Sequence, residues 1–291
     1  PAIVARAEVR DGKFEWANIE LYGKKIDKAA ILVPVEIKGS SLKFFAQLDT
    51  GSDGTIFYGK ILEKFGLKFD SSGKDSIDFN WGLIDTANNP VWATIDLDWT
   101  SDDSVDILSE RAIDRVIGSI GIDQINGKIL ILNLPSQEYS LLSDLSQLKT
   151  DWAGKIKLLD ARQDRSGRLY VDVIIKNDTL KNVLFDTGSS SSTLTLPKEL
   201  WQRATGLQGI EPSVQKDSIT SWGVTLHQFR SPAKGDLEFG AITVKAPIID
   251  FIEWQDPSLK DFKIMGLVPF CDKYIVVLDC KNSKFGLVES K

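Results

Sequence analysis

The chain has 291 residues, of which 42% are apolar and 26% charged. It is longer than a single hydrophobic core usually supports, so two domains of about 120 to 150 residues are expected. The 35 Lys and Arg residues and 41 Asp and Glu residues give a net charge of -6, with no basic stripe to neutralise phosphates, which argues against a nucleic-acid partner. No apolar run reaches the roughly 18 residues that span a bilayer, so no transmembrane segment is expected.

The first pattern along the chain is a β-hairpin that leads into Asp-Thr-Gly-Ser. Apolar segments over 31–39 and 42–48 are separated by a short turn, and the tetrapeptide at 49–52 follows the second segment directly. This pattern predicts that Asp49 stands at the end of a strand. A short helix is predicted over 60–65.

The rest of the first half contains a Trp-Gly pair, Trp81 and Gly82, and an apolar-apolar-Gly motif that ends at Gly121. Apolar segments at 129–132 and 141–142 predict two further strands. A polar stretch with little hydrophobic periodicity follows. We therefore expect an N-terminal lobe over 1–148, a linker over 149–154 and a C-terminal lobe over 155–291.

The second half repeats these features in the same order. Apolar segments over 169–177 and 183–185 predict a second hairpin, which again leads directly into Asp-Thr-Gly-Ser, at 186–189. A helix is predicted at 197–202, where Pro occupies the first turn. Trp222 again precedes a Gly. The remaining matches are an apolar-apolar-Gly motif ending at Gly266 and strands over 275–278 and 287–288.

This repetition determines how the chain is interpreted. A single Asp-Thr-Gly is a weak signal, but two copies in matching surroundings indicate a duplicated unit. Short strand segments, turns rich in Gly, Asn and Ser, and few helical periodicities predict a mainly β protein. The two tetrapeptides, each at a strand end, are the candidate active site.

Two carboxyls on tight Gly turns have a chemistry of their own. If Asp49 and Asp186 face each other across a pseudo-twofold axis, they share one proton and hold a water molecule between them. The ionised carboxyl takes a proton from the water as it attacks a peptide carbonyl, and the protonated carboxyl donates a hydrogen bond to the developing oxyanion. The sequence leaves open which Asp is the base.

The neighbouring residues of each tetrapeptide have supporting roles in this scheme. Gly51 and Gly188 allow the turn and leave room for the opposite half. Thr50 and Thr187 are expected to form hydrogen bonds across the axis and so to fix the separation of the carboxyls.

These motifs resemble those of the pepsin and retropepsin clan of aspartic peptidases, in the single-chain, two-lobed arrangement. The resemblance extends over about residues 30–291 and is most specific at 185–189, 264–266, 274–279 and 282–287. It implies a bilobal, pepsin-like fold of two β-barrel-like lobes, related by a pseudo-twofold axis, with a cleft between them. The absence of the several disulfides of animal pepsins points to a microbial relative.

The resemblance also implies a function. Asp49 and Asp186 would be the catalytic pair of an endopeptidase that acts on peptide or protein substrates, as a monomer and without a cofactor, while Gly121 and Gly266 would pack against the catalytic loops. The sequence does not specify the compartment; we favour an extracytoplasmic one, periplasmic or secreted. The alternative function is a catalytically weak or inactive protein that binds peptides on the same fold.

The serines lead to an expectation about pH. By the resemblance, Ser52 and Ser189 would donate hydrogen bonds to the outer carboxyl oxygens. Such bonds favour the charged form and lower both pKa values of the pair, so maximal activity is expected clearly below neutral pH.

The flap is where the sequence departs from pepsins. Pepsins cover the substrate with a Tyr on a hairpin of the first lobe, but no Tyr occurs here between residues 58 and 139. Trp81 and Gly82 occupy a suitable place, and Trp222 is their counterpart in the second half. We therefore consider these residues for a flap or substrate-binding role, with core packing of both tryptophans as the alternative.

The remaining reactive side chains point to neither a metal site nor a cysteine nucleophile. Cys271 and Cys280 flank a predicted strand, 274–278, that would hold them beyond disulfide reach, so free thiols are expected. The single His, His227, is expected at the surface. No ligand spacing surrounds either Cys, so no metal is expected.

Overall fold

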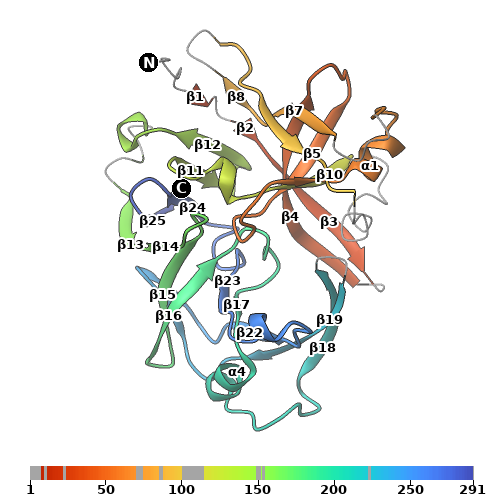
Figure 1. The fold of residues 1–291 in the computed structure, drawn as a ribbon. Helices are drawn as coiled ribbons and strands as arrows, with labels where there is room; N and C mark the ends of the chain where they lie inside the picture. Colours follow the sequence, from red (N-terminus) through yellow and green to blue (C-terminus); the bar gives the residue numbers. More distant parts are fainter. Residues whose placement is uncertain are drawn as a thin grey trace.

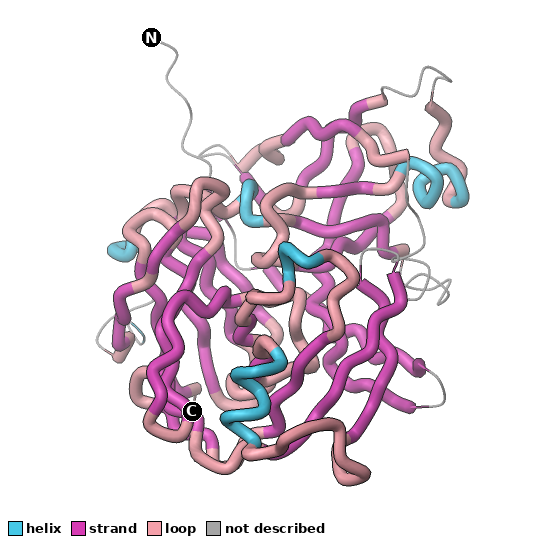
Figure 2. Tube along the Cα trace, turned by 60° about the horizontal axis from the view of Figure 1, so that its bottom comes forward, coloured by secondary structure: helices cyan, strands magenta, loops and turns pink. Residues whose placement is uncertain are grey.

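The structure is a computed structural model that describes residues 8–9, 12–21, 24–69, 75–84, 88–99, 115–148, 152, 155–221 and 224–290. Within these ranges the chain is mainly β, as predicted, with sheets of seven, six and ten strands and one two-stranded pair. Two of the sheets curl towards barrels, which is consistent with β-barrel-like lobes (Figure 1). The helical segments are short and separated from one another (Figure 2).

The seven-stranded sheet is built from the first half of the chain. Its central hairpin pairs β4 (Lys24–Ile37) with β5 (Lys43–Leu48), as predicted for this segment. β10 (Val116–Ile120) runs parallel to β5 and antiparallel to β6 (Ile56–Phe57). The other members are β3 (Glu15–Leu21), β7 (Ser76–Asn80) and β9 (Ala93–Asp96); helix α1 (Gly59–Lys64) confirms the helix predicted at 60–65.

The ten-stranded sheet repeats this arrangement with the second half. The predicted hairpin is present as β15 (Leu169–Ile175) and β16 (Asp178–Phe185). β23 (Ile264–Met265) runs parallel to β16 and antiparallel to β17 (Leu194–Thr195), as β10 does between β5 and β6. The remaining strands are β14 (Arg162–Gln163), β18 (Gln215–Ser221), β19 (Val224–Pro232), β20 (Leu237–Phe239), β21 (Ile242–Val244) and β22 (Ile248–Ile252). Helix α4 (Lys198–Thr205) buries Trp201 against Phe251.

The six-stranded sheet joins the two halves. Its central pair, β11 (Ile129–Asn133) and β24 (Tyr274–Asp279), comes from opposite halves and is antiparallel. The outer strands are β13 (Lys157–Asp160), β25 (Lys284–Glu289), β12 (Glu138–Leu142) and β2 (Gly12–Lys13). The predicted linker is described only at Trp152, and its other residues lie outside the described ranges. Because β11 and β12 precede this linker and β13, β24 and β25 follow it, strands from both sides of the linker belong to one shared sheet.

Alternate residues of the shared sheet are buried in different clusters. Leu130 and Val276 belong to the main core, which runs through both halves, whereas Ile131 and Val277 form a smaller cluster on the other face. Smaller elements complete the fold: β1 (Glu8–Val9) pairs with β8 (Leu83–Ile84), and 3-10 helices lie at Ile122–Gln124, Leu145–Gln147 and Pro257–Leu259.

Three expectations about single features can be compared directly with the structure. Cys271 and Cys280 are both buried and both free, as expected. His227 is exposed on β19, in agreement with a surface position. Over the described ranges, no helix is both long and apolar enough to cross a membrane.

Candidate active site

Each Asp-Thr-Gly-Ser segment begins where a central strand ends. β5 and β16 end one residue before Asp49 and Asp186, respectively. The Asp49 N–H donates to Ile120 O and the Asp186 N–H donates to Met265 O, both at 3.0 Å. The last residues of β10 and β23 therefore fix the two aspartates in the same way.

The two loops are tied together by their threonines. The Thr50 N–H donates to Thr187 Oγ1 at 3.0 Å, and the Thr187 N–H donates to Thr50 Oγ1 at 3.1 Å. Each hydroxyl in turn donates to a main-chain carbonyl of the opposite half, Thr50 to Phe185 O at 3.3 Å and Thr187 to Leu48 O at 2.7 Å. Both threonines are buried, so these four bonds lie away from water. The expected bonds across the axis are present.

The carboxyls meet over the glycines of the two loops. The Gly51 N–H donates to Oδ1 of both Asp49, at 3.0 Å, and Asp186, at 3.1 Å. The Gly188 N–H donates to Asp186 Oδ1 at 2.7 Å. A Cβ at Gly51 would lie 2.5 Å from Asp186 Cγ, and one at Gly188 would lie 2.7 Å from Asp49 Cγ. Only glycine therefore allows the close approach of the two loops.

The two carboxyls share the Gly51 N–H as a donor, and a direct hydrogen bond between them would require that one of them carries a proton. Burial raises the pKa of Asp49 above its usual value, against the opposing effect of its hydrogen bonds. Burial also raises the pKa of Asp186, and the charge of Asp49 raises it further, so that it lies well above the usual value. These directions favour an ionised Asp49 and a protonated Asp186.

Gly121 and Gly266 support the loops from behind, as the resemblance implied. A Cβ at Gly121 would lie 2.4 Å from the Gly54 carbonyl, and one at Gly266 would lie 2.2 Å from Ser189 O. Thr55 was not predicted as part of the site; its hydroxyl accepts the Gly121 N–H at 3.0 Å and donates to Asp123 Oδ1 at 2.8 Å. Although Thr55 lies just after the first Asp-Thr-Gly-Ser, its partner Gly121 is 66 residues away along the chain, so no local pattern indicates this role.

The hydroxyls of Ser52 and Ser189 do not contact the carboxyls in the expected way. Ser52 Oγ donates to Gly54 O at 2.8 Å, and it is the Ser52 N–H that donates to Asp49 Oδ1, at 3.0 Å. Within the described residues, no hydrogen bond joins Ser189 Oγ to Asp186. Main-chain N–H groups supply donors to the carboxyls instead, so the proposed effect of the hydroxyls on the pKa values is wrong for this structure.

Trp81 is a core residue and does not cover a substrate. Its side chain is 1% exposed and stacks on Tyr139, with ring centroids 5.8 Å apart. The Tyr139 hydroxyl donates to Trp81 O at 2.8 Å. Gly82 adopts φ +100°, and a Cβ there would lie 2.9 Å from that hydroxyl. The flap assignment of both residues is therefore corrected to a packing role, while Trp222 lies outside the described residues.

The cross-loop bonds lead to a stability prediction. Thr187→Val is expected to lower the free energy of unfolding by about 2–6 kcal/mol, because it leaves the Leu48 carbonyl and the Thr50 N–H buried and unpaired, at roughly 1–3 kcal/mol each. Thr187→Ser should lose much less, since it keeps the hydroxyl. Chemical denaturation measures both. The matched control is Thr193→Val, a buried Thr whose hydroxyl makes no hydrogen bond within the described part of the chain, and an equal loss there would contradict the interpretation.

Comparison of the chain with models of protein families gives no match, and comparison with curated proteins gives no significant match. Over the part of the chain that the structure describes, no group of three or more His, Cys, Asp and Glu is arranged to hold a metal ion. A functional assignment therefore depends on the geometry of the paired carboxyls.

Proposed function

We propose that the protein is an aspartic endopeptidase, on a two-lobed pepsin-like fold, that hydrolyses peptide bonds with water activated between Asp49 and Asp186. The observation that carries this proposal is the buried carboxyl pair that shares the Gly51 N–H, presented by two loops that interlock through Thr50 and Thr187. Such a pair holds one proton and one negative charge, which are the two groups that addition of water to an amide requires.

The reaction needs two steps. In the first, Asp49 accepts a proton from water while the water oxygen forms a bond to the peptide carbon, and Asp186 donates its proton to the carbonyl oxygen, which gives a neutral gem-diol. In the second, the proton on Asp49 passes to the amide nitrogen, one gem-diol hydroxyl returns its proton to Asp186, and the C–N bond breaks. The products are a carboxylic acid and an amine, and the pair regains its starting protonation.

A peptide library tests the function directly. The protein is incubated with the library from about pH 3 to about pH 8, and mass spectrometry identifies new termini. Cleavage that a statine-type transition-state mimic blocks is the expected result. If a folded sample cleaves no peptide at any of these pH values, or if the mimic has no effect on cleavage, the proposal is wrong.

The pH dependence of cleavage follows from the pKa directions. Activity requires the pair with one proton, so kcat/KM should fall on the acid side as Asp49 is protonated and on the basic side as Asp186 ionises. Because both pKa values are raised, both limbs should lie above the ordinary Asp pKa of about 3.9. The pH at which kcat/KM is maximal then lies closer to neutral than it would if the serine hydroxyls donated hydrogen bonds to the carboxyls.

The serine variants separate the two explanations of the pH profile. Ser52→Ala and Ser189→Ala should leave both limbs where they are, because Ser52 Oγ donates to Gly54 O and, among the described residues, no hydrogen bond joins Ser189 Oγ to Asp186. An upward shift of the basic limb in Ser189→Ala would restore the original expectation, and an acid limb at or below the ordinary Asp pKa would contradict the raised values.

A further inference from the structure

The two halves place different side chains at matched positions beside the carboxyl pair. Gln47 and Leu184 each lie two residues before an Asp of the pair. Gln47 is in register with Ser119 on the parallel strand β10, and Leu184 is in register with Ile264 on the parallel strand β23. Since neighbours in register lie on the same face of a sheet, about 4.8 Å apart, each half brings two side chains together close to its Asp.

These side chains lie on the face of each strand that points away from the main core. The residues on either side of Gln47, Ala46 and Leu48, belong to the main core, and so do the residues on either side of Leu184. Side chains alternate between the two faces of a strand, so Gln47 and Leu184 point to the opposite face. The Asp that follows each strand is two residues further on and lies on this same side.

A contact between the halves places the Gln47 side chain beside the pair. Gln47 Nε2 lies 3.5 Å from Gly188 O, which belongs to the loop of the opposite half. The N–H of the same Gly188 donates to Asp186 Oδ1 at 2.7 Å. The Gln47 amide therefore reaches from the first half to the residue that holds the carboxyl of the second.

The matched positions differ in polarity. The first half carries an amide and a hydroxyl, Gln47 and Ser119, where the second half carries two hydrocarbon side chains, Leu184 and Ile264. Gln47, Ser119 and Ile264 are half-buried, so part of each side chain is accessible to a bound chain. Two identical halves would treat both sides of a scissile bond alike, whereas these halves offer a polar surface on one side and an apolar surface on the other.

The polar side retains unused capacity for hydrogen bonds. A Gln amide has two N–H donors and one acceptor oxygen, and among the described residues only one donor of Gln47 is engaged, in the long contact with Gly188 O. No partner for Ser119 Oγ occurs in the part of the chain that the structure describes. Partly buried polar groups without partners cost free energy, and a ligand that supplies a donor and an acceptor recovers it.

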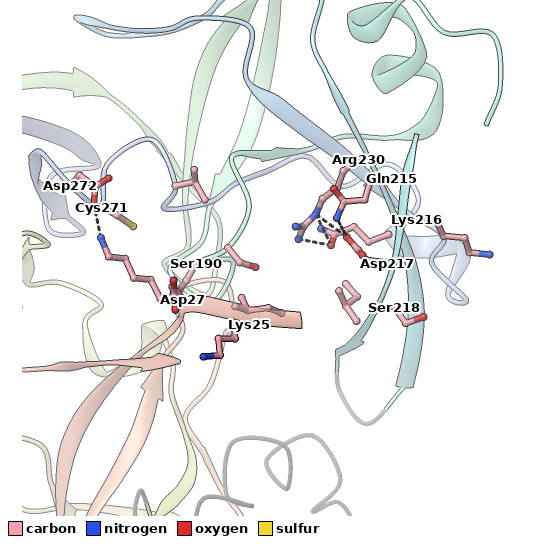
Figure 3. Close-up of a pocket in the computed structure, with 16 residues that line it drawn as sticks. Lys25, Asp27, Ser190, Gln215, Lys216, Asp217, Ser218, Arg230, Cys271 and Asp272 are labelled. Carbon is pink, nitrogen blue, oxygen red and sulfur yellow. Dashed lines mark hydrogen bonds and ion pairs between the residues drawn. The ribbon is translucent and has the colours of Figure 1, made fainter. Parts of the chain in front are cut away.

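The polar groups in the pocket beside Ser190, drawn in Figure 3, are different in this respect. Gln215 donates to Asp217 Oδ2 at 2.6 Å. Lys28 donates to Asp272 Oδ1 at 2.5 Å. Because these groups already have partners, they give less reason to select a polar side chain than the amide of β5 and the hydroxyl of β10 do.

We propose that Gln47 and Ser119 determine specificity, so that the protein cleaves between a polar, uncharged residue on the side of the first half and an apolar residue on the side of Leu184 and Ile264. Asn, Gln, Ser and Thr fit the polar side, because their side chains supply hydrogen-bonding groups and bring no charge that this surface would leave unpaired. This inference rests on the proposed function, because it names the residues that flank the bond cleaved at the carboxyl pair.

The peptide library that tests the function also tests this specificity. The residues on the two sides of every cleaved bond are counted separately. On one side, we expect polar uncharged residues to be favoured over apolar residues of similar size by about ten-fold or more, and on the other side we expect the reverse. Cleavage between two apolar residues, or cleavage without preference, would overturn the inference while leaving the proposed function intact.

A variant assigns the preference to Gln47. Gln47→Leu introduces the residue that the second half carries at the matched position, Leu184. We expect the polar side to become apolar, with a change in preference of about ten-fold or more, while the preference on the other side stays as it is. A purely structural role would instead lower the cleavage of all peptides in proportion.

Lys43→Leu is the matched control. Lys43 is exposed on the same face of β5, four residues before Gln47 and so about 13 Å further from the pair. This variant should keep the wild-type preference on both sides. If Gln47→Leu also keeps that preference, or if both variants change it equally, Gln47 does not determine specificity.

Binding tests the inference without cleavage. If no peptide is hydrolysed, the proposed function fails, and the affinities of three labelled statine-type peptides are then compared by fluorescence anisotropy. One has Leu on both sides of the statine, and the other two have Gln on one side or on the other. Tighter binding of one Gln peptide than of the Leu peptide, lost in Gln47→Leu and kept in Lys43→Leu, would support the inference. Equal binding of the three peptides would contradict it.

Discussion

Asp49→Asn and Asp186→Asn are each expected to reduce kcat/KM for peptide hydrolysis by about 10³-fold or more, with the fold retained. The amide has nearly the shape of the carboxyl and still accepts the loop N–H bonds, but it cannot exchange a proton with water or with the peptide oxygen. Because the pair acts as a unit, either replacement should cost about as much as both together. Peptide cleavage measured with saturating protein, beside a thermal melt of each variant, is the experiment.

Asp250 offers a matched control for these variants. It is also buried and its pKa is also raised by burial, but it accepts a bond from Thr195 Oγ1 at 2.6 Å and makes no contact with the carboxyl pair among the described residues. Asp250→Asn should therefore keep cleavage activity. If it loses as much activity as Asp186→Asn, the effect reflects loss of a buried acid in general, and the assignment of chemistry to the pair fails.

Local patterns were sufficient to predict the two loops. Each hairpin is continuous along the chain, so two apolar segments separated by a short turn were enough to predict the β4–β5 and β15–β16 hairpins. Because each tetrapeptide directly follows the second segment, it was expected at a strand end. The bonds between Thr50 and Thr187 follow from the near-identity of the two segments, since an isologous contact uses the same residues on both sides.

Partners that are distant along the chain could not be predicted in this way. The segment 129–132 was predicted as a strand, but its apolar sequence does not indicate that it pairs with β24 from the other half. The position of Trp81 depends likewise on Tyr139, which arrives from another strand to stack on it. The hydroxyl of Ser52 donates to Gly54 O rather than to Asp49, a choice between two nearby acceptors that residue types do not reveal.

At neutral pH, Asp186→Asn is expected to be more stable to unfolding than the wild type, although it is inactive. The pKa of Asp186 is raised in the folded protein, so the folded state holds a proton that the unfolded chain releases near the ordinary Asp pKa of about 3.9. A group of this kind stabilises fully below the unfolded pKa, and its contribution is lost as pH rises through the folded pKa. Each unit of the raised pKa corresponds to roughly 1.4 kcal/mol.

The difference between variant and wild type should therefore grow with pH. It should be small at about pH 3, where the wild-type carboxyl is protonated in both states, and it should rise between the unfolded and the folded pKa of Asp186 before it levels off. Asp144 provides a control of opposite sign, because hydrogen bonds from Ser146 and Lys281 lower its pKa to about 2. Relative to the wild type, Asp144→Asn should therefore lose stability as pH rises, whereas Asp186→Asn gains it. Chemical denaturation of the three proteins across this pH range measures the effect. If the difference between Asp186→Asn and the wild type stays constant with pH, Asp186 ionises normally in the folded protein. That result would remove the shared proton on which the proposed mechanism depends.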